Sequence, residues 1–152
     1  RLFEFAAKNN IPSVIMHSDK IPAVSNDFTT GNIIEEIYFS LYKKIEKCKA
    51  AGMEQKNIII DPGIGFGKSI DGCFEILRRI NEFNTLKTPL LLGISRKSFI
   101  RKSFNINTDE ADIPSALYAA AAKDVNIHRV HNVKLTKQFL EYVSKINLFS
   151  KY

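Results

Sequence analysis

The sequence predicts an α/β protein in which buried strands alternate with helices around a parallel sheet. Short apolar runs rich in β-branched residues recur along the chain, and each is followed by a longer segment whose apolar residues have helical spacing. Residues 58–60, Ile-Ile-Ile, are apolar on both faces, as is typical of strands in parallel sheets. The expected order is one helix followed by four strand–helix units.

The individual elements follow from these patterns and from capping residues. Asn32 or Thr30 can cap the first long helix, Ser69 can cap the next, and Pro114 suits the first turn of a later one. The loop of residues 18–31 is long for a strand–helix connection, so we expect it to be a functional loop. We expect strands at residues 11–17, 57–61, 89–94 and 126–131, and helices at residues 1–8, 33–51, 70–84, 99–102, 114–122 and 133–146.

Two architectures fit this order of elements. One is an open doubly wound sheet, and the other is half of a TIM barrel, the (β/α)8 fold, which has roughly 250 residues when complete. Four parallel strands alone leave two edges uncovered, which natural folds avoid. Because the chain of 152 residues also begins within a helical pattern, the half-barrel is favoured, with its other half expected upstream.

Composition and charge argue against several classes of function. The net charge of +6 is spread along the helices without a long basic run, so nucleic-acid binding is not expected. Cys48 and Cys73 form no C-x-x-C pair and the three histidines are dispersed, so we expect reduced structural thiols and no zinc site. No apolar segment reaches about 18 residues, so no membrane span is expected. These features together predict a cytoplasmic protein.

Polar residues stand at the predicted C-terminal ends of all four strands, where a barrel carries its active site. They are His17, Asp61, Lys97 and the pair Arg129 and His131. Since strand side chains alternate with a period of two, Arg129 and His131 share a face. Arg presents a planar fork suited to phosphate, His can donate to an adjoining oxygen, and Lys adds a point charge. The sequence therefore predicts an anion site built from at least two strands.

Asp61 is the acidic residue among these cations, and two interpretations remain open. It could form a structural ion pair with Lys97 or Arg129. It could instead recognise a ligand with adjacent N–H donors, because a carboxylate accepts two hydrogen bonds at once. The guanidine-like edges of pterins and guanines offer that pattern.

Residues 63–69, Gly-Ile-Gly-Phe-Gly-Lys-Ser, come close to a phosphate-binding P-loop but do not match it. The P-loop pattern G-x-x-x-x-G-K-[ST] requires Gly at position 62, where this chain has Pro62. The dinucleotide pattern G-x-G-x-x-G also fails, because the last Gly comes one place early. An ATPase is therefore disfavoured, and we expect Lys68 to be a surface lysine and Ser69 to be a helix cap.

Two histidines are expected to have structural roles. His17 could be a base or a ligand, but we expect a hydrogen-bonded residue at the mouth of the barrel. His128 lies on the outward face of its strand, so we expect it to be packed with its hydrogen bonds satisfied. Phe74 is expected to pack between helices.

Three motifs together resemble dihydropteroate synthase, an enzyme of folate biosynthesis. They are Asp-Pro-Gly-Ile-Gly-Phe-Gly-Lys at residues 61–68, Gly-Ile-Ser-Arg-Lys-Ser at residues 93–98 and Arg-Val-His-Asn-Val at residues 129–133. Residues 14–17, Val-Ile-Met-His, resemble the family's fifth strand. The resemblance implies that residues 1–152 are the C-terminal half of a pterin-binding TIM barrel, with strands five to eight, and that the N-terminal half is absent.

The resemblance implies a transferase that condenses 6-hydroxymethyl-dihydropterin diphosphate with p-aminobenzoate, giving dihydropteroate and diphosphate. Asp61 and Lys97 would be the catalytic residues, holding opposite sides of the pterin. Met16 would pack against the pterin ring. Arg129 would lie against the pterin and, with His131, hold the diphosphate.

The second substrate would enter a pocket lined by Gly65, Phe66 and Ser98, where Ser98 and nearby backbone N–H groups would meet its carboxylate. The resemblance also implies Mg²⁺ as a cofactor, with its ligand in the missing N-terminal half and no metal ligand in this chain. The chain would pair with an N-terminal half or form a homodimer through its late helices. Alone, this half would be inactive.

Two alternatives remain at this point. A related pterin-binding methyltransferase would share the carboxylate for the pterin but need not have the Arg129 and His131 pair. A non-catalytic remnant half-barrel is suggested by the missing half. Residues 114–126 favour the same alternative, because they are shorter than the family's usual last crossover.

Overall fold

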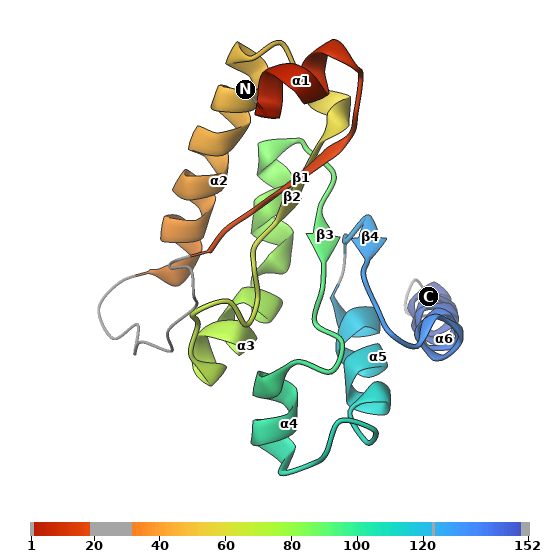
Figure 1. Cartoon of the computed structure of the whole chain (residues 1–152). Coiled ribbons are helices and arrows are strands. Elements are labelled where there is room, and N and C mark those ends of the chain that lie inside the picture. Colours follow the sequence, from red (N-terminus) through yellow and green to blue (C-terminus); the bar gives the residue numbers. More distant parts are fainter. Residues whose placement is uncertain (1, 19–31, 123, 150–152) are drawn as a thin grey trace.

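Four parallel strands lie side by side at the centre of the computed structural model, which describes residues 2–18, 32–122 and 124–149 (Figure 1). They are β1 (Ser13–Met16), β2 (Ile58–Asp61), β3 (Leu91–Leu92) and β4 (Ile127–His128). β1 pairs with β2 and β3 with β4, and a parallel bridge between Ile60 and Leu90 joins the two pairs. Each strand thus lies beside its predecessor, which is the order of a (β/α)8 barrel and not of a doubly wound sheet.

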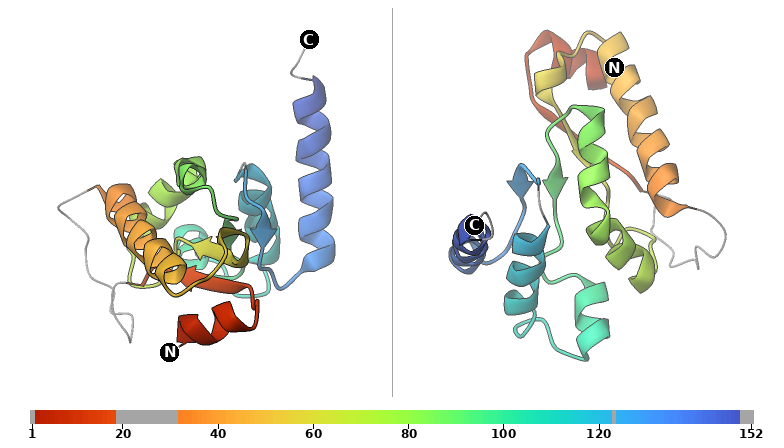
Figure 2. Two further views of the ribbon diagram at one scale, coloured as in Figure 1. Left: turned by 90° about the horizontal axis from the view of Figure 1, so that it is seen from above. Right: turned by 180° about the vertical axis from the view of Figure 1, so that it is seen from behind.

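Helices form an outer layer over these strands. Seen from above, α2, α3, η2, α5 and α6 follow one another round one side of the strands, and the end of α6 projects beyond the other elements (Figure 2). None of the helices in the described part of the chain has both the length and the apolar character to cross a membrane. The helices are α1 (Leu2–Lys8), α2 (Ile33–Ala50), α3 (Ile70–Arg78), α4 (Ser98–Phe104), α5 (Asp112–Ala121) and α6 (Val133–Phe149), with the 3-10 helices η1 (Gln55–Asn57) and η2 (Ile80–Leu86).

The hydrophobic core lies between the strands and this outer layer. On α2, Ile37, Leu41 and Ile45 are spaced by four and are fully buried, so they form one apolar stripe. On β2, Ile58 and Ile60 are also fully buried. Since α2 packs against both β1 and β2, this stripe covers the first half of the sheet.

The predicted caps of the two helices that follow β1 and β2 are confirmed. Oδ1 of Asn32 accepts the N–H of Ile34 at 3.2 Å, and Oγ of Ser69 accepts the N–H of Gly72 at 3.1 Å. Thr30, the alternative cap of α2, lies outside the described residues, as does all but the first residue of the predicted functional loop at 18–31.

The single helix expected at residues 70–84 is wrong, because α3 ends at Arg78 and η2 takes its place. Ile80, Phe83 and Leu86 of η2 are all buried and are three residues apart. That spacing brings side chains onto one face of a 3-10 helix, with three residues per turn, but not of an α-helix.

Phe74 packs between helices as expected. Its ring centroid lies 5.4 Å from that of Phe99 and 5.6 Å from that of Tyr118, and both contacts are edge-on. These rings join α3 to α4 and α5. α3 buries Cys73 and Ile76 most deeply.

The second pair of strands is shorter than the predicted ranges 89–94 and 126–131. Hydrogen bonds continue beyond the regular ladder, since the N–H of Arg129 donates to the carbonyl of Leu92 at 2.9 Å. Within the described residues β4 pairs with β3 alone. α5 begins at Asp112, two residues before the predicted start at Pro114.

We expect Phe83→Ala to destabilise the protein strongly. Phe83 is fully buried in η2, and removing such a ring costs about 3–5 kcal/mol because a cavity remains. Urea unfolding would measure the shift of the midpoint. Phe5→Ala is the matched control, since Phe5 on α1 is 61% exposed and its removal should change stability by about 0.5 kcal/mol or less. Equal effects of the two substitutions would contradict this assignment of the core.

Candidate functional site

Asp61 is the last residue of β2 and is almost fully buried, with 3% of its surface exposed. Its Oδ1 accepts the N–H of Gly63 at 2.7 Å, and its Oδ2 lies 3.4 Å from Nη2 of Arg129. The predicted ion pair with Arg129 is therefore present. This contact is longer than a usual charge-assisted hydrogen bond, and the Arg129 side chain is 57% exposed. A ligand could therefore replace Arg129 as the partner of Asp61.

The glycine loop after Asp61 makes two close approaches at glycines with positive φ, a conformation in which a side chain would be strained. Gly63 has φ +69°, and a Cβ there would lie 1.8 Å from the carbonyl oxygen of His17. Gly65 has φ +83°, and a Cβ there would lie 3.0 Å from Cδ of Lys97. The loop therefore contacts the end of β1 on one side and the loop after β3 on the other.

Lys68 is not the surface lysine that we expected, because only 8% of it is exposed. Its Nζ donates to the carbonyls of Gly63 at 3.0 Å and Phe66 at 3.2 Å, and lies 3.1 Å from Nδ1 of His17. The glycines with positive φ turn the loop back over its own lysine. His17 is confirmed as a hydrogen-bonded residue at a strand end, and accepting a hydrogen bond from Nζ of Lys68 requires that Nδ1 of its ring carry no hydrogen.

Lys97 reaches from the loop after β3 to the glycine loop. Its Nζ donates to the carbonyl of Ile64 and lies 4.4 Å from the centre of the Phe66 ring, which is a cation–π contact. Burial lowers the pKa of Lys97 to about 8, although the nearby charge of Asp61 acts in the opposite direction. The side chain is therefore mostly a cation at pH 7, and a small rise in pH removes its charge.

A pocket of about 350 Å³ lies between the ends of β3 and β4, and we call it the cationic pocket. The structure brings Lys97, Arg129 and His131 together in it. Oγ of Ser95 lies 2.9 Å from Nδ1 of His131, and a Cβ at Gly93 would lie 2.8 Å from Nη2 of Arg129. Its lining residues include no carboxylate, so it suits an anion. They are Gly93, Ser95, Lys97, Arg129, Val130 and His131.

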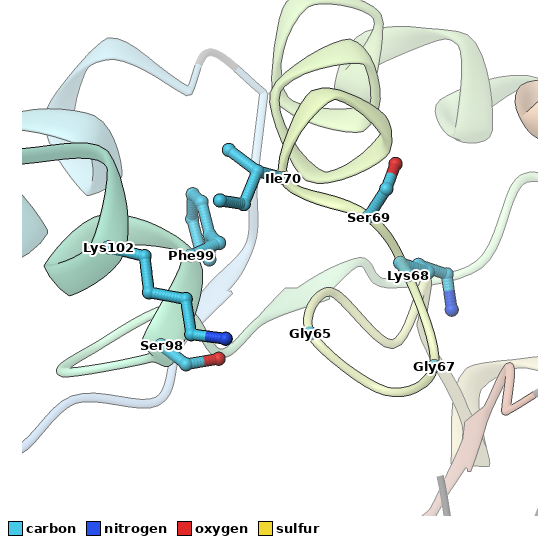
Figure 3. A pocket seen from close by; sticks show the side chains of 8 residues that line it. All are labelled: Gly65, Gly67, Lys68, Ser69, Ile70, Ser98, Phe99 and Lys102. Atoms are coloured by element: carbon cyan, nitrogen blue, oxygen red, sulfur yellow. The ribbon is translucent and has the colours of Figure 1, made fainter. Parts of the chain in front are cut away.

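A second pocket, of about 300 Å³, lies between the glycine loop and α4 (Figure 3). Ser98 and Lys102, one turn apart on α4, direct Oγ and Nζ toward the same space, across from Gly65 and Gly67. This pocket offers hydroxyl and amino groups and no carboxylate. Its lining residues are Gly65, Gly67, Lys68, Ser69, Ile70, Ser98, Phe99 and Lys102.

Two of the residues expected at the site, Met16 and Phe66, line neither of these pockets. Met16 ends β1, is half-buried and pairs in register with Asp61, and its carbonyl accepts from Nζ of Lys44 at 2.6 Å. Phe66 was expected in the wall of the second pocket with Gly65 and Ser98. Its ring instead lies against Lys97.

His128 is packed but its hydrogen bonds are not satisfied as expected. It is half-buried, and its Nδ1 has no hydrogen-bond partner among the described residues. Burial lowers the pKa of this imidazole. The outward direction that the strand period assigns to His128 keeps it away from both pockets.

Two further spacings in the sequence relate to these pockets. Ser95 precedes Lys97 by two residues, and Lys102 follows Ser98 by four, which places the second pair on one face of a helix. No group of three or more His, Cys, Asp or Glu side chains in the described part of the chain is placed to hold a metal ion.

Comparisons with known proteins agree with this geometry. The family described as "Pterin binding enzyme" matches residues 1–131. Dihydropteroate synthase of Haemophilus influenzae is 35% identical over 142 residues, which cover 91% of this chain and 51% of that protein. The Escherichia coli K12 enzyme of the same name is 32% identical over 143 residues, covering 92% of this chain and 51% of that protein.

Solved structures give the same result. The Anaplasma phagocytophilum dihydropteroate synthase with bound 6-hydroxymethylpterin-monophosphate superimposes with a TM-score of 0.88 at 28% identity, covering 95% of this chain and 59% of that one. The Yersinia pestis enzyme in complex with a sulfonamide drug gives 0.87 at 29% identity, covering 95% and 54%. The chain spans about half the length of the curated relatives it matches. With this sequence similarity and this fold, the chain belongs to the pterin-binding enzyme family.

Proposed function

We propose that this chain is part of a dihydropteroate synthase, which joins 6-hydroxymethyl-dihydropterin diphosphate to p-aminobenzoate. The observation that carries the proposal is the placement of one buried carboxylate, Asp61, at the strand ends that also carry two carboxylate-free pockets. A pterin presents adjacent N–H donors to a carboxylate, while diphosphate and benzoate are both anions. The three parts of the site thus fit the three parts of the reaction.

Asp61 would accept the amino and ring N–H groups of the pterin. Oδ1 is partly used by Gly63, but a carboxylate has about four acceptor positions, so two remain for the ligand even with Arg129 in place. Lys97 would bond polar atoms on the opposite side of the ring. Met16, at the end of the adjacent strand, would pack against the ring face.

The cationic pocket would hold the diphosphate. The aniline nitrogen attacks the methylene carbon of the pterin substrate, a C–N bond forms, and the C–O bond to diphosphate breaks with its electron pair leaving on oxygen. The nitrogen then loses a proton to restore the neutral amine. Arg129 and His131 would stabilise the charge that develops on the departing oxygen, so catalysis consists of positioning and electrostatic stabilisation.

The second pocket would hold p-aminobenzoate, with Gly65 at one wall and Ser98 at the other. Phe66 would lie beside the pocket, where its ring makes a cation–π contact with Lys97. A Xanthomonas albilineans dihydropteroate synthase with bound 4-aminobenzoic acid superimposes on this chain with a TM-score of 0.86 at 26% identity. That complex supports the choice of second substrate.

The complete site would need the remaining half of the relatives' length. Apolar side chains are exposed on both outer strands of the row, Val14 on β1 to 47% and Ile127 on β4 to 37%. Further strands of a barrel would cover these edges. We also assign Mg²⁺ to ligands beyond this chain, and no step proposed here depends on it.

The chain, fused to or mixed with an N-terminal half-barrel of a dihydropteroate synthase, should form dihydropteroate from the two substrates in the presence of Mg²⁺. Product formation can be followed by chromatography. Inorganic diphosphate should compete with the pterin substrate, because the cationic pocket holds that group. A sulfonamide should compete with p-aminobenzoate. The proposed activity would be refuted by a folded assembly that forms no product. It would also be refuted if inorganic diphosphate did not compete with the pterin substrate.

We expect Asp61→Asn to lower kcat/KM for the pterin substrate by about 10- to 100-fold for each hydrogen bond lost, since bonds to a charged group are worth roughly 1.5–3 kcal/mol. Asn keeps an oxygen for the N–H of Gly63, so the loop should fold. Asp71→Asn is the control, because Asp71 is an exposed carboxylate on α3. If steady-state kinetics gave the same kcat/KM for both variants, Asp61 would have no role in pterin recognition.

We expect kcat/KM for the pterin substrate to fall above about pH 8, by about tenfold per pH unit, because Lys97 loses its proton there. Lys97→Arg should move this decline to higher pH, since guanidinium stays charged. Lys134→Arg, on α6, should leave the profile unchanged. A flat profile to pH 9.5 in the unmodified protein would show that the charge of Lys97 is not needed.

The lowered pKa of Lys97 affects stability in the opposite direction from activity. A rise in pH should lower kcat/KM but increase the free energy of unfolding. Folded Lys97 loses its proton near pH 8, whereas the unfolded chain keeps it to about pH 10.5. The unfolded state therefore binds more protons in this window, and the free energy of unfolding should rise with pH between these values. Lys97→Met should abolish that rise in urea unfolding experiments.

A further inference from the structure

Asp112, the first residue of α5, joins the two loops that form the cationic pocket. Its Oδ1 accepts Nε of Arg96 at 2.7 Å, and its Oδ2 accepts Nη2 of Arg96 at 3.0 Å. The same Oδ2 accepts Nδ2 of Asn132 at 3.0 Å. Arg96 belongs to the loop after β3, and Asn132 belongs to the loop after β4. One carboxylate thus bonds to both walls of the pocket.

Arg96 precedes Lys97, and its backbone is held in an unusual conformation. Its φ is +57°, a region that non-glycine residues enter only when the surroundings impose it. Its N–H donates to Oγ of Ser115 at 3.0 Å, one turn along α5 from Asp112. The backbone N–H and the guanidinium of Arg96 are therefore both hydrogen-bonded to α5. These bonds fix the direction of the backbone at the next residue, Lys97.

Asn132 follows His131, and each polar atom of its side chain has a partner. Oδ1 accepts the N–H of Leu135 at 3.0 Å and so caps α6, while Nδ2 donates to Asp112. These two contacts determine the orientation of the amide. The backbone between Arg129 and α6 is consequently anchored one residue beyond the imidazole.

The cluster is charged under all working conditions. Hydrogen bonds from Arg96 and then from Asn132 lower the pKa of Asp112 to about 2, so the carboxylate stays ionised. The bidentate fork fixes a planar geometry that a single contact would not. The Asp112 side chain is 16% exposed and that of Arg96 is 31% exposed, so both are sheltered from solvent more than a surface pair is.

We propose that Asp112 is a positioning residue, which sets the separation of Lys97 and His131 across the cationic pocket without touching the substrate. This inference rests on the proposed function for its kinetic effect and on geometry for its effect on anion binding. Among the described residues no hydrogen bond joins Asp112 to Lys97 or to His131, although the charge of His131 acts on Asp112, and each of the two follows or precedes a residue whose side chain bonds Asp112. A displacement of reacting groups by about 1 Å can cost roughly 10²-fold in rate, which sets the scale of the effect.

Asp112→Asn tests the proposal, in the chain assembled with its complementary half. We expect the KM for the pterin substrate and the Kd for inorganic diphosphate, measured by calorimetry, each to rise about tenfold or more. The KM for p-aminobenzoate should change less than about threefold, because the second pocket is built from α4 and the glycine loop. Asp112→Glu, which keeps the charge, should recover part of the loss. Arg96→Lys keeps the charge but not the bidentate contact. It should also raise the KM for the pterin substrate more than the KM for p-aminobenzoate, but by a smaller factor than Asp112→Asn.

Asp109→Asn is the matched control. Asp109 is an exposed carboxylate near enough to raise the pKa of Arg96, so its removal takes away the same charge without the bonds. It should leave both KM values and the diphosphate Kd unchanged. A lower melting temperature of Asp112→Asn with unchanged diphosphate affinity would overturn the proposal, as would an equal rise in both KM values. If the unmodified assembly forms no dihydropteroate, the proposed function fails, and the diphosphate Kd still decides the role of Asp112.

Discussion

The contact between the glycine loop and the end of β1 constrains the rest of the site. At Gly63 there is no room for a side chain, because the carbonyl of His17 occupies the place of its Cβ. This contact lets Lys68 fold inward to bond His17 and two carbonyls of its own loop. The loop, closed in this way, presents Gly65 and Phe66 to Lys97. Three strands are thus connected through a segment that would lose its shape with any β-carbon at its first turn.

The balance of charge around Asp61 supports the ligand proposed for this site. Arg129 contacts Asp61, Lys97 acts on it electrostatically, and the cationic pocket beside it contains no carboxylate. An excess of cations near a buried carboxylate suits a ligand that carries both N–H donors and negative charge. A neutral pterin without diphosphate would leave Arg129 and His131 without an anion to bind. The electrostatics therefore favour a pterin with an anionic leaving group over the methyl-transferring alternative, which needs no such pair.

The sequence predicted the residues at strand ends well, because a period of two and a parallel sheet place them without knowledge of packing. Asp61, Lys97, Arg129 and His131 do gather at one edge. It failed where tertiary contacts decide. The burial of Lys68 depends on where positive-φ glycines turn the loop, and η2 depends on whether a spacing of three continues an α-helix or a 3-10 helix. Strand alternation also could not predict that Nδ1 of His128 has no hydrogen-bond partner among the described residues.

Asp112 shows the limit of motif reading most clearly. It lies outside the three motifs that resemble dihydropteroate synthase, yet it bonds residues inside two of them. Nothing in the spacing of residues 96, 112 and 132 indicates contact, because the fold alone brings α5 against both loops. Motif residues can supply the groups that touch a ligand, while a residue outside the motifs bonds the two loops that carry them. A site assembled from strand ends needs such cross-loop contacts, because the ends of parallel strands are joined only through their helices.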